Sequence, residues 1–173
     1  QALRPAGYDA EVVHLVTLLQ NLGRLLTAYH FPDELLQIQR LMGEADDAGM
    51  SEQAASYAVL GADIEGIGAA VARHWGLDDA VLHLIRRLPL ATPPRAIDND
   101  DDMLRAVASC ANEAVDALGL PEARRSPALR RVAQRYGRAL HIKLEDLQDA
   151  LRATRGGVAK PREEAALPQD SVI

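Results

Sequence analysis

Residues 12–26 read Val-Val-His-Leu-Val-Thr-Leu-Leu-Gln-Asn-Leu-Gly-Arg-Leu-Leu, and this stretch decides the fold class. Its apolar residues recur at the three- and four-residue spacing of an α-helix and do not alternate as in a β-strand. They cover most of the helix circumference, which is typical of a helix at the centre of a bundle. Asp9 precedes the stretch, and its carboxylate is suited to cap the first turn. The sequence therefore predicts a central helix over residues 12–26.

The same helical periodicity continues along the chain, without a useful length of strand-like alternation. Helix starts are marked by Pro32, Ser51, Asp78 and the Ser-Pro pair at 126–127, since these residue types favour the first turn or its cap. We expect about eight helices and no sheet. The predicted fold class is therefore all-α, a multi-helix bundle. The predicted helices cover residues 12–26, 32–42, 51–60, 63–75, 78–88, 104–118, 126–140 and 144–153.

Composition bounds the class of protein. A hydrophobic content of 48% with 25% charged residues is typical of a globular chain. We expect residues 1–154 to form a single helical domain. Residues 155–173 lack periodicity and carry balanced charge, which predicts a disordered tail. The only cysteine, Cys110, stands in an apolar string and is expected to be a buried filler.

Several classes of function are disfavoured. The formal charge of −6 argues against nucleic-acid binding by counterion release. A single cysteine excludes an internal disulfide or a thiolate zinc cluster. Because no apolar run approaches the ~20 residues of a membrane span, we expect no membrane association and favour a cytoplasmic protein. The chain begins with Gln1, so we expect it to be a piece of something longer.

One motif points to a site. Residues 18–25 (Leu-Leu-Gln-Asn-Leu-Gly-Arg-Leu) resemble the helix that carries adjacent His and Asp metal ligands in HD-type phosphohydrolases, where the pattern is Leu-Leu-His-Asp-Ile-Gly-Lys. Gln20 takes the place of the His, and Asn21 that of the Asp. A neutral amide oxygen is a weak ligand for a transition metal. We therefore expect Gln20 and Asn21 to serve structure, by hydrogen bonds that join neighbouring helices.

A second stretch extends the resemblance. Residues 59–68 (Val-Leu-Gly-Ala-Asp-Ile-Glu-Gly-Ile-Gly), followed by Arg-His-Trp-Gly-Leu at 73–77, are similar to the pattern of HDOD domains (HD-related output domains), a degenerate branch of the same superfamily. The resemblance covers residues 12–118 and implies a helical fold of the HD-domain-like type. It also implies that the family's N-terminal helices are absent here, and that no metal or cofactor is held. The degenerate pocket positions that it implies are Gln20, Asn21, Asp63, Ile64, Arg86, Arg87 and Asn112.

HDOD relatives are joined to kinase-like, diguanylate-cyclase, phosphodiesterase or sensor modules. The resemblance thus implies a bacterial, non-catalytic regulatory module for signal transduction, whose partner is a protein or an attached signalling domain. One alternative is a metal-dependent phosphohydrolase with substituted ligands. Another is a nucleotide- or cyclic-dinucleotide-binding module built on Arg73, Arg86 and Arg87, because guanidinium groups grip phosphate by paired donors.

Other residues carry weaker hypotheses. A relocated metal site would use His14 and His83, although no His-x-x-x-His pair exists. Asp98, Asp100 and Asp102 have the spacing of a calcium loop, but Met and Ser stand where the loop needs Gly and Glu, so we interpret them as a solvated turn. We expect the small residues Gly61, Gly66 and Gly68 with the nearby alanines to let two helices approach closely. Finally, Arg131, Arg135 and Arg138 share one helix face, which is a possible docking site for an acidic partner.

Overall fold

The structure is a computed structural model that describes residues 9–43, 49–90, 94, 97 and 99–157. Over these residues the chain forms nine helices and no strand, which confirms the predicted all-α class. The helices are α1 (Ala10–Leu19), α2 (Leu22–His30), α3 (Pro32–Gly43), α4 (Glu52–Leu60), α5 (Ile64–His74), α6 (Asp79–Leu84), α7 (Asp100–Gly119), α8 (Glu122–Leu140) and α9 (Leu144–Gly157).

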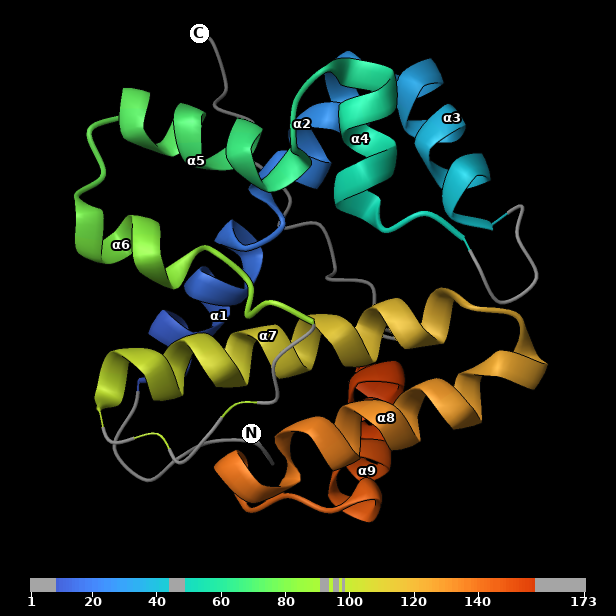
Figure 1. Cartoon of the computed structure of the whole chain (residues 1–173). Coiled ribbons are helices and arrows are strands. Elements are labelled where there is room, and N and C mark those ends of the chain that lie inside the picture. Colours follow the sequence, from blue (N-terminus) through green and yellow to red (C-terminus); the bar gives the residue numbers. More distant parts are fainter. Residues whose placement is uncertain (1–8, 44–48, 91–93, 95–96, 98, 158–173) are drawn as a thin grey trace, which may run out of the picture.

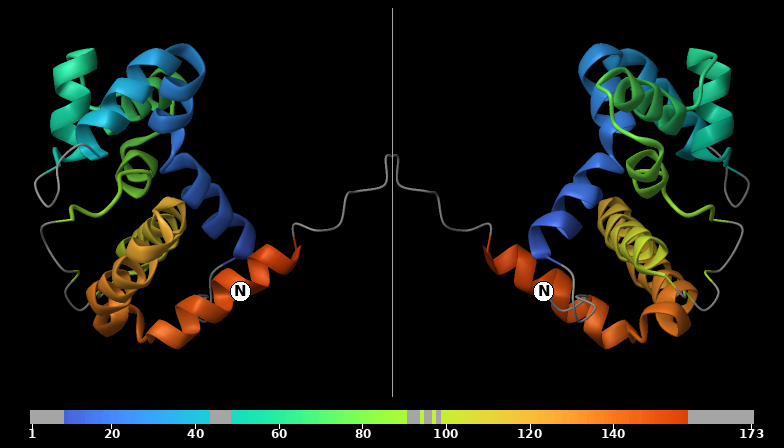
Figure 2. Two further views of the ribbon diagram at one scale, coloured as in Figure 1. Left: turned by 90° about the vertical axis from the view of Figure 1, so that its right-hand side faces the viewer. Right: turned by 90° about the vertical axis from the view of Figure 1, so that its left-hand side faces the viewer.

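The long helix α7 crosses the middle of the molecule (Figure 1). On one side of it α1 and α6 pack against it, and beyond them α2 to α5 pack together, with α2 on α5 and α3 on α4. On the other side α8 runs antiparallel to α7, and α9 packs on α8. In Figure 2, α1 and α9 lie on the same side of α7. This arrangement places the end of α1 beside the middle of α7, where the candidate site lies.

The predicted single helix over residues 12–26 is wrong, because the chain bends at Gln20 and Asn21. Asn21 has φ −100° and ψ 3°, and its backbone N–H donates to the Leu18 carbonyl at 2.9 Å, so the regular helical ladder is interrupted. A close contact further along explains the change of direction. A Cβ atom added to Gly23 would lie only 1.9 Å from the Ile64 carbonyl oxygen, so α2 is seated directly on the start of α5.

The expectation that this stretch is buried on most sides is also wrong. Leu15, Leu18 and Leu25 are 54%, 49% and 58% exposed, whereas Val16 is buried. The bend turns the inner faces of α1 and α2 toward different neighbours, α7 and α5 respectively. Leu15, Leu18 and Leu25 consequently stay on the surface, whereas Leu19 and Leu22 are partly buried against the core cluster of α5 and α6.

Local signals located most helix starts correctly. Side chains of Asp9, Ser51, Asp63 and Asp78 accept hydrogen bonds from backbone N–H groups at the starts of α1, α4, α5 and α6. These contacts satisfy donors that have no partner within the helix. The α6 helix ends at Leu84 rather than at residue 88, so the segment that follows can run along α7.

The predicted start of α8 at Ser126 and Pro127 is wrong, because the helix begins at Glu122 and Pro127 lies inside it. A proline in this place removes one backbone donor. The apolar face of α8 outweighs that loss, since Leu129, Val132 and Tyr136 are buried against α7 and α9. The burial of this face decides the extent of the helix.

The close helix approach that the small residues predict is confirmed at Gly68. A Cβ atom there would lie 2.7 Å from the backbone nitrogen of Gly23, so α2 and α5 cross with their backbones in contact. Gly61 has a different role and ends α4 in the left-handed region at φ 69°. Gly66 is exposed.

The apolar core on the α7–α8–α9 side surrounds Tyr136 and Cys110, both fully buried. Burial raises the pKa of the Cys110 thiol to about 12, which agrees with the predicted filler role.

Helix α9 continues to Gly157, so the predicted tail begins too early, and residues 158–173 lie outside the described residues. In the described part of the chain, no single helix is long and apolar enough to span a membrane, although the bent pair α4 and α5 meets the length and composition test when taken together.

Candidate functional site

Gln20 sits at the end of α1 and is 5% exposed. Its Nε2 donates to the carbonyl oxygens of Leu84 at 3.0 Å and Arg105 at 3.4 Å. Its Oε1 accepts from Asn112 Nδ2 at 3.2 Å and from Ser109 Oγ at 3.4 Å. One side chain thus joins α1 to the end of α6 and to α7. Both the donating and the accepting capacity of the amide are used, and the predicted hydrogen bonds between neighbouring helices are present.

Asn21 extends the same cluster. Its Nδ2 donates to Asn112 Oδ1 at 2.7 Å and to the Thr17 carbonyl at 3.1 Å. Its Oδ1 accepts from Arg24 Nη1 at 3.4 Å and from a short contact with Arg87 Nη2. Asn112 Nδ2 donates to the Thr17 carbonyl as well, at 3.1 Å. Asn21 therefore also forms the hydrogen bond to a neighbouring helix that the sequence predicts.

Arg87 brings a positive charge into this cluster. Its side chain is 8% exposed, and Nη1 donates to Asp116 Oδ2 on α7 at 2.6 Å. The second cation at the rim, Arg24, forms a forked pair with Glu52 on α4 and lies 3.8 Å from the same Asp116 oxygen. Arg87 Nε has no hydrogen-bond partner within the described part of the chain. The two guanidinium groups are thus neutralised by carboxylates of the chain itself.

The residues present do not fit the divalent metal of HD-type enzymes. Gln20, Asn21 and Asn112 offer neutral amides that already bond to one another, and the Arg87 guanidinium beside Asn21 repels a cation. A transition metal prefers imidazole, carboxylate or thiolate donors. Among the described residues, no group of three or more His, Cys, Asp or Glu side chains is close enough to hold a metal ion.

The model of the HDOD domain family matches residues 3–88 of this chain. This part of the chain belongs to the HDOD domain family. HDOD domains are associated with signalling. Comparison with curated proteins gives no match, and comparison with solved structures gives none either. The match is shorter than the predicted span of residues 12–118, so helices α7 to α9 lie outside it.

The amide cluster therefore spans the boundary of the HDOD segment, residues 3–88. Gln20, Asn21 and Arg87 belong to the segment, whereas Asn112 and Asp116 come from α7, outside it. The bonds of Gln20 to Arg105, Ser109 and Asn112, of Asn21 to Asn112 and of Arg87 to Asp116 cross from the HDOD part to α7, whereas those to Leu84 and Glu52 and the Arg87–Asn21 contact stay within it. The cluster is consequently the polar joint between the HDOD segment and α7.

The other predicted pocket residues of the HDOD segment lie elsewhere. Asp63 caps α5, where its carboxylate accepts from the Glu65 and Gly66 N–H groups at 3.3 Å. Ile64 is 2% exposed and packs among the apolar residues of α3 and α4. Arg86 is exposed. The predicted residues that the structure brings together are Gln20, Asn21, Arg87 and Asn112.

Two members of the cluster escaped the sequence analysis. Ser109 Oγ donates to Gln20 and accepts from the Leu88 N–H at 3.1 Å, and Asp116 pairs with Arg87. Their spacing is the sequence feature that could have revealed them. Ser109 stands three residues before Asn112 and Asp116 four residues after it, so all three share one helix face. Without a known partner helix, that face could not be distinguished from an exposed one.

The weaker metal hypotheses find different explanations. His83 Nε2 lies 3.0 Å from Asp102 Oδ1 at the start of α7, while His14 is exposed on α1. Of the calcium-like aspartates, Asp98 lies outside the described residues. Asn99 caps α7 by accepting from the Asp102 N–H at 2.8 Å, so the last aspartates belong to the first helical turn.

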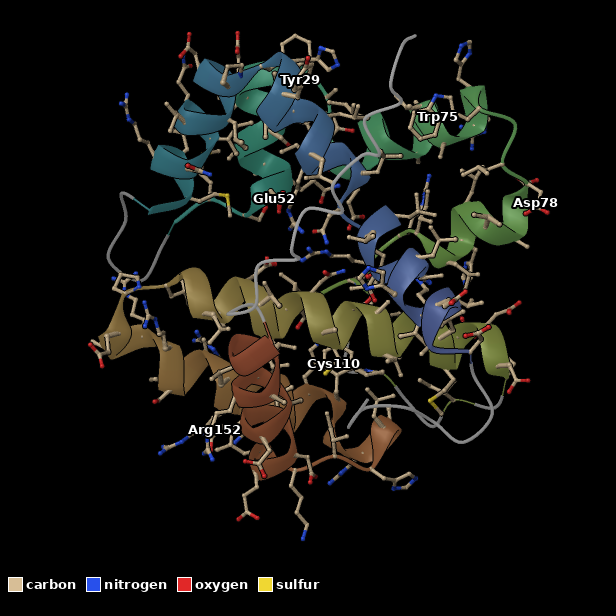
Figure 3. All side chains as sticks on the ribbon, turned by 180° about the vertical axis from the view of Figure 1, so that it is seen from behind. Tyr29, Glu52, Trp75, Asp78, Cys110 and Arg152 are labelled. Atoms are coloured by element: carbon tan, nitrogen blue, oxygen red, sulfur yellow. The ribbon has the colours of Figure 1, made fainter. Side chains whose placement is uncertain are left out.

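The three arginines of the predicted basic face of α8 differ in exposure. Arg131 and Arg138 are exposed. The Arg135 side chain is only 11% exposed and donates to the Pro89 carbonyl at 2.5 Å, to the Leu88 carbonyl at 3.3 Å and in a short contact to that of Leu90. Arg135 therefore ties residues 88–90 to α8, and of the three predicted docking arginines Arg131 and Arg138 stay on the surface. At the far end of α5, Trp75 is 58% exposed (Figure 3).

Proposed function

We propose that this chain is a non-catalytic regulatory module of a larger cytoplasmic signalling protein and acts through protein–protein contacts. One observation carries the proposal. The positions that hold metal ligands in HD-type phosphohydrolases are Gln20 and Asn21 here, and both amides bond to Asn112 on α7. A hydrolase of that type needs a metal-bound water as nucleophile. The donor set of this chain supports a joint between helices instead.

The proposed mechanism is a change of helix packing at this joint. The amide cluster and the Arg87–Asp116 pair connect the α1–α2 bend to α7, and Arg135 connects the same segment to α8. A partner that binds α1 or α7 would alter these contacts together, because they share one set of donors and acceptors. Packed interfaces with a few discrete arrangements convert small shifts into such changes.

The nucleotide-binding alternative has less support. Of its three arginines, Arg73 and Arg86 are exposed on the surface, and Arg87 is already paired with Asp116. A phosphate would have to compete with that carboxylate for the buried guanidinium. Thermal-shift measurements with nucleotides and cyclic dinucleotides test this alternative, and we expect the melting temperature to stay unchanged.

The main test measures metal and turnover together. The purified chain is analysed for bound divalent metal after incubation with manganese and iron, and is assayed for hydrolysis of bis(p-nitrophenyl) phosphate and of a cyclic dinucleotide. We expect no stoichiometric metal and no turnover above buffer, while an HD phosphohydrolase assayed in parallel is active. Metal-dependent hydrolysis by this chain would contradict the proposal.

The variant Gln20→His with Asn21→Asp sharpens the test. Restoring these two ligands is expected to give no hydrolase activity, because Ile64, Arg86 and Arg87 still occupy the other positions. A catalytic metal site needs several ligands at once. Turnover by the double variant would show that other residues of the chain complete the site.

A further inference from the structure

An apolar groove lies between α1, α7 and α9. Figure 2 shows how these three helices are arranged. It encloses about 780 Å³. Its floor is formed by Val107 and Ala114 of α7, both buried, and by Leu147 of α9. Val115 also lines the groove and is 58% exposed. Exposed apolar grooves are typical of surfaces that bind another molecule.

The walls of the groove favour a helix as occupant. Ala10, Ala111, Ala150 and Ala153 line it from all three helices. Small side chains let a further helix approach to the usual interaxial distance of about 8–10 Å. An extended peptide is disfavoured, because apolar walls leave its backbone N–H and C=O groups without partners. A helix satisfies those groups internally and can bury one apolar face.

The charge around the groove selects the kind of helix. Among the lining residues, Asp149 carries an acidic side chain. It is exposed and forms an ion pair at 3.1 Å with Arg152, which is exposed as well. Asp9 and Glu11 stand at the neighbouring start of α1, and among the described residues no Lys or Arg lines the groove. The chain as a whole carries a formal charge of −6. Complementary charge steers association and disfavours like-charged partners.

We propose that the α1–α7–α9 groove binds an amphipathic helix of a partner protein, with an apolar face toward the alanine walls and basic residues at its flanks. The proposal rests on the proposed regulatory function and names the surface and the partner chemistry for it. Thr17 connects the two sites, since it lines the groove and its carbonyl accepts from Asn21 and Asn112. A helix bound in the groove therefore touches the residue that anchors the amide cluster.

The test uses a fluorescein-labelled helical peptide of leucine and lysine, with leucines on one face at the i, i+3, i+4, i+7 spacing. A leucine–glutamate peptide of the same pattern is the acidic counterpart. Fluorescence anisotropy with the whole chain measures binding of each peptide. We expect saturable binding of the basic peptide, weaker by at least about tenfold for the acidic one.

Matched variants locate the binding. Ala150→Phe fills the groove and is expected to weaken the basic peptide by about tenfold or more, whereas Ala70→Phe, at an exposed alanine of α5, leaves binding unchanged. If Ala150→Phe fails to fold, Val115→Lys at the exposed groove position replaces it and is expected to weaken binding equally. Asp149→Lys is expected to reverse the preference toward the acidic peptide.

Four results would overturn the proposal. Equal binding of the two peptides, or binding that Ala150→Phe does not change, would remove the groove as the site. A doubled mass in sedimentation that Ala150→Phe abolishes would assign the groove to a second copy of the chain. Binding of the dye anilinonaphthalene sulfonate without peptide binding would assign it to a small apolar ligand. The metal and hydrolysis assays do not involve the groove, so failure here leaves the proposed lack of catalysis standing.

Discussion

Gln20 is the residue of the cluster at which replacing the amide by a carboxylate is expected to destabilise the fold most. Its Nε2 faces two carbonyl oxygens, those of Leu84 and Arg105, and its Oε1 faces two donors. A carboxylate in this place would bring negative charge against the two carbonyls. An amide avoids that repulsion and satisfies all four neighbours. The residue is also buried, so water cannot relieve a mismatch.

Gln20→Glu is therefore expected to lower the free energy of unfolding by about 3 kcal/mol at neutral pH. The new carboxyl would have a folded-state pKa above its unfolded value, so the loss is smaller at pH 5 than at pH 8. Urea denaturation at both pH values measures this. Gln53→Glu on the exposed face of α4 is the control and is expected to change little. An equally small effect of Gln20→Glu would show that Gln20 is open to solvent.

Asn21→Asp is expected to cost less than Gln20→Glu. The Asn21 Oδ1 already lies beside the Arg24 and Arg87 guanidinium groups, which would stabilise a carboxylate. The variant loses only the donors to Thr17 and Asn112. The same urea series gives the comparison. A larger loss for Asn21→Asp than for Gln20→Glu would mean that Arg87 does not neutralise this position.

Glu113 gives the chain a pH-dependent contribution to stability. It accepts from Tyr136 Oη at 2.6 Å and is 3.5 Å from Arg135 Nε, and burial raises the pKa of its carboxyl. A raised folded pKa means that its contribution is full below the unfolded pKa of about 4.3 and is lost as the pH rises through the folded pKa. The unfolding free energy of the wild type should thus fall relative to Glu113→Gln between pH 4 and pH 8. A constant difference across that range would contradict the raised pKa.

At the scale of the helix, features that depend on neighbouring residues could be predicted from the sequence, whereas features that depend on contacts between distant residues could not. Caps at Asp9 and Ser51 were found because a capping residue and its helix are neighbours in sequence. The bend at Asn21 was missed because its cause, the contact of Gly23 with the Ile64 carbonyl, joins residues far apart in the chain. The start of α8 was missed for a similar reason, since burial against α7 overrides the local proline signal.

The same rule applies to the candidate site. Gln20, Asn21, Arg87 and Asn112 were found because a family resemblance carries information about long-range contacts. Periodicity alone placed Arg135 on an exposed face with Arg131 and Arg138, but the carbonyls of residues 88–90 draw it inward. No local pattern encodes which neighbour a long side chain will meet.

The crossing of α2 and α5 yields a prediction at this scale. Gly23→Ala places a Cβ 1.9 Å from a backbone oxygen, so the two helices must separate. Overpacking of this kind costs about 1–3 kcal/mol, which exceeds the ~1 kcal/mol gained in helix propensity. Gly119→Ala is the control, since no atom lies within 4 Å of its added Cβ. Thermal melting of both variants measures the difference. Equal melting temperatures would mean that the helices are not in backbone contact.

At the scale of the whole molecule, α7 is shared by two groups of helices. It contacts α1 and α6 of the HDOD segment on one side and α8 on the other. Its buried residues are mostly small, with Ala106, Ala108 and Cys110 fully enclosed. The family match ends before α7, yet the polar joint of the HDOD segment is completed by it. The HDOD segment and the later helices are therefore expected to unfold together.

Truncation tests this dependence. A fragment that ends at residue 90 retains Gln20, Asn21 and Arg87 but loses α7, and with it the hydrogen bonds to Asn112 and Asp116 and the apolar contacts of Val16. Each lost hydrogen bond is worth about 0.5–1.5 kcal/mol, and the apolar faces that α7 covers become exposed to water. We expect the fragment to lose the cooperative thermal transition of the whole chain in circular dichroism at 222 nm, a helix-sensitive wavelength. A cooperative melt at the same temperature would show that the HDOD segment folds independently.

We infer that mutual hydrogen bonds between amides replace a metal ion at the α1–α2 bend. The most direct measurement is the melting temperature of the purified chain with excess manganese and with a chelator. A ligand that binds the native state raises the melting temperature, by an amount that grows with the logarithm of its free concentration relative to its Kd. We expect identical melting temperatures under both conditions. A rise with manganese that the chelator reverses, and that Asn112→Leu abolishes, would contradict the claim.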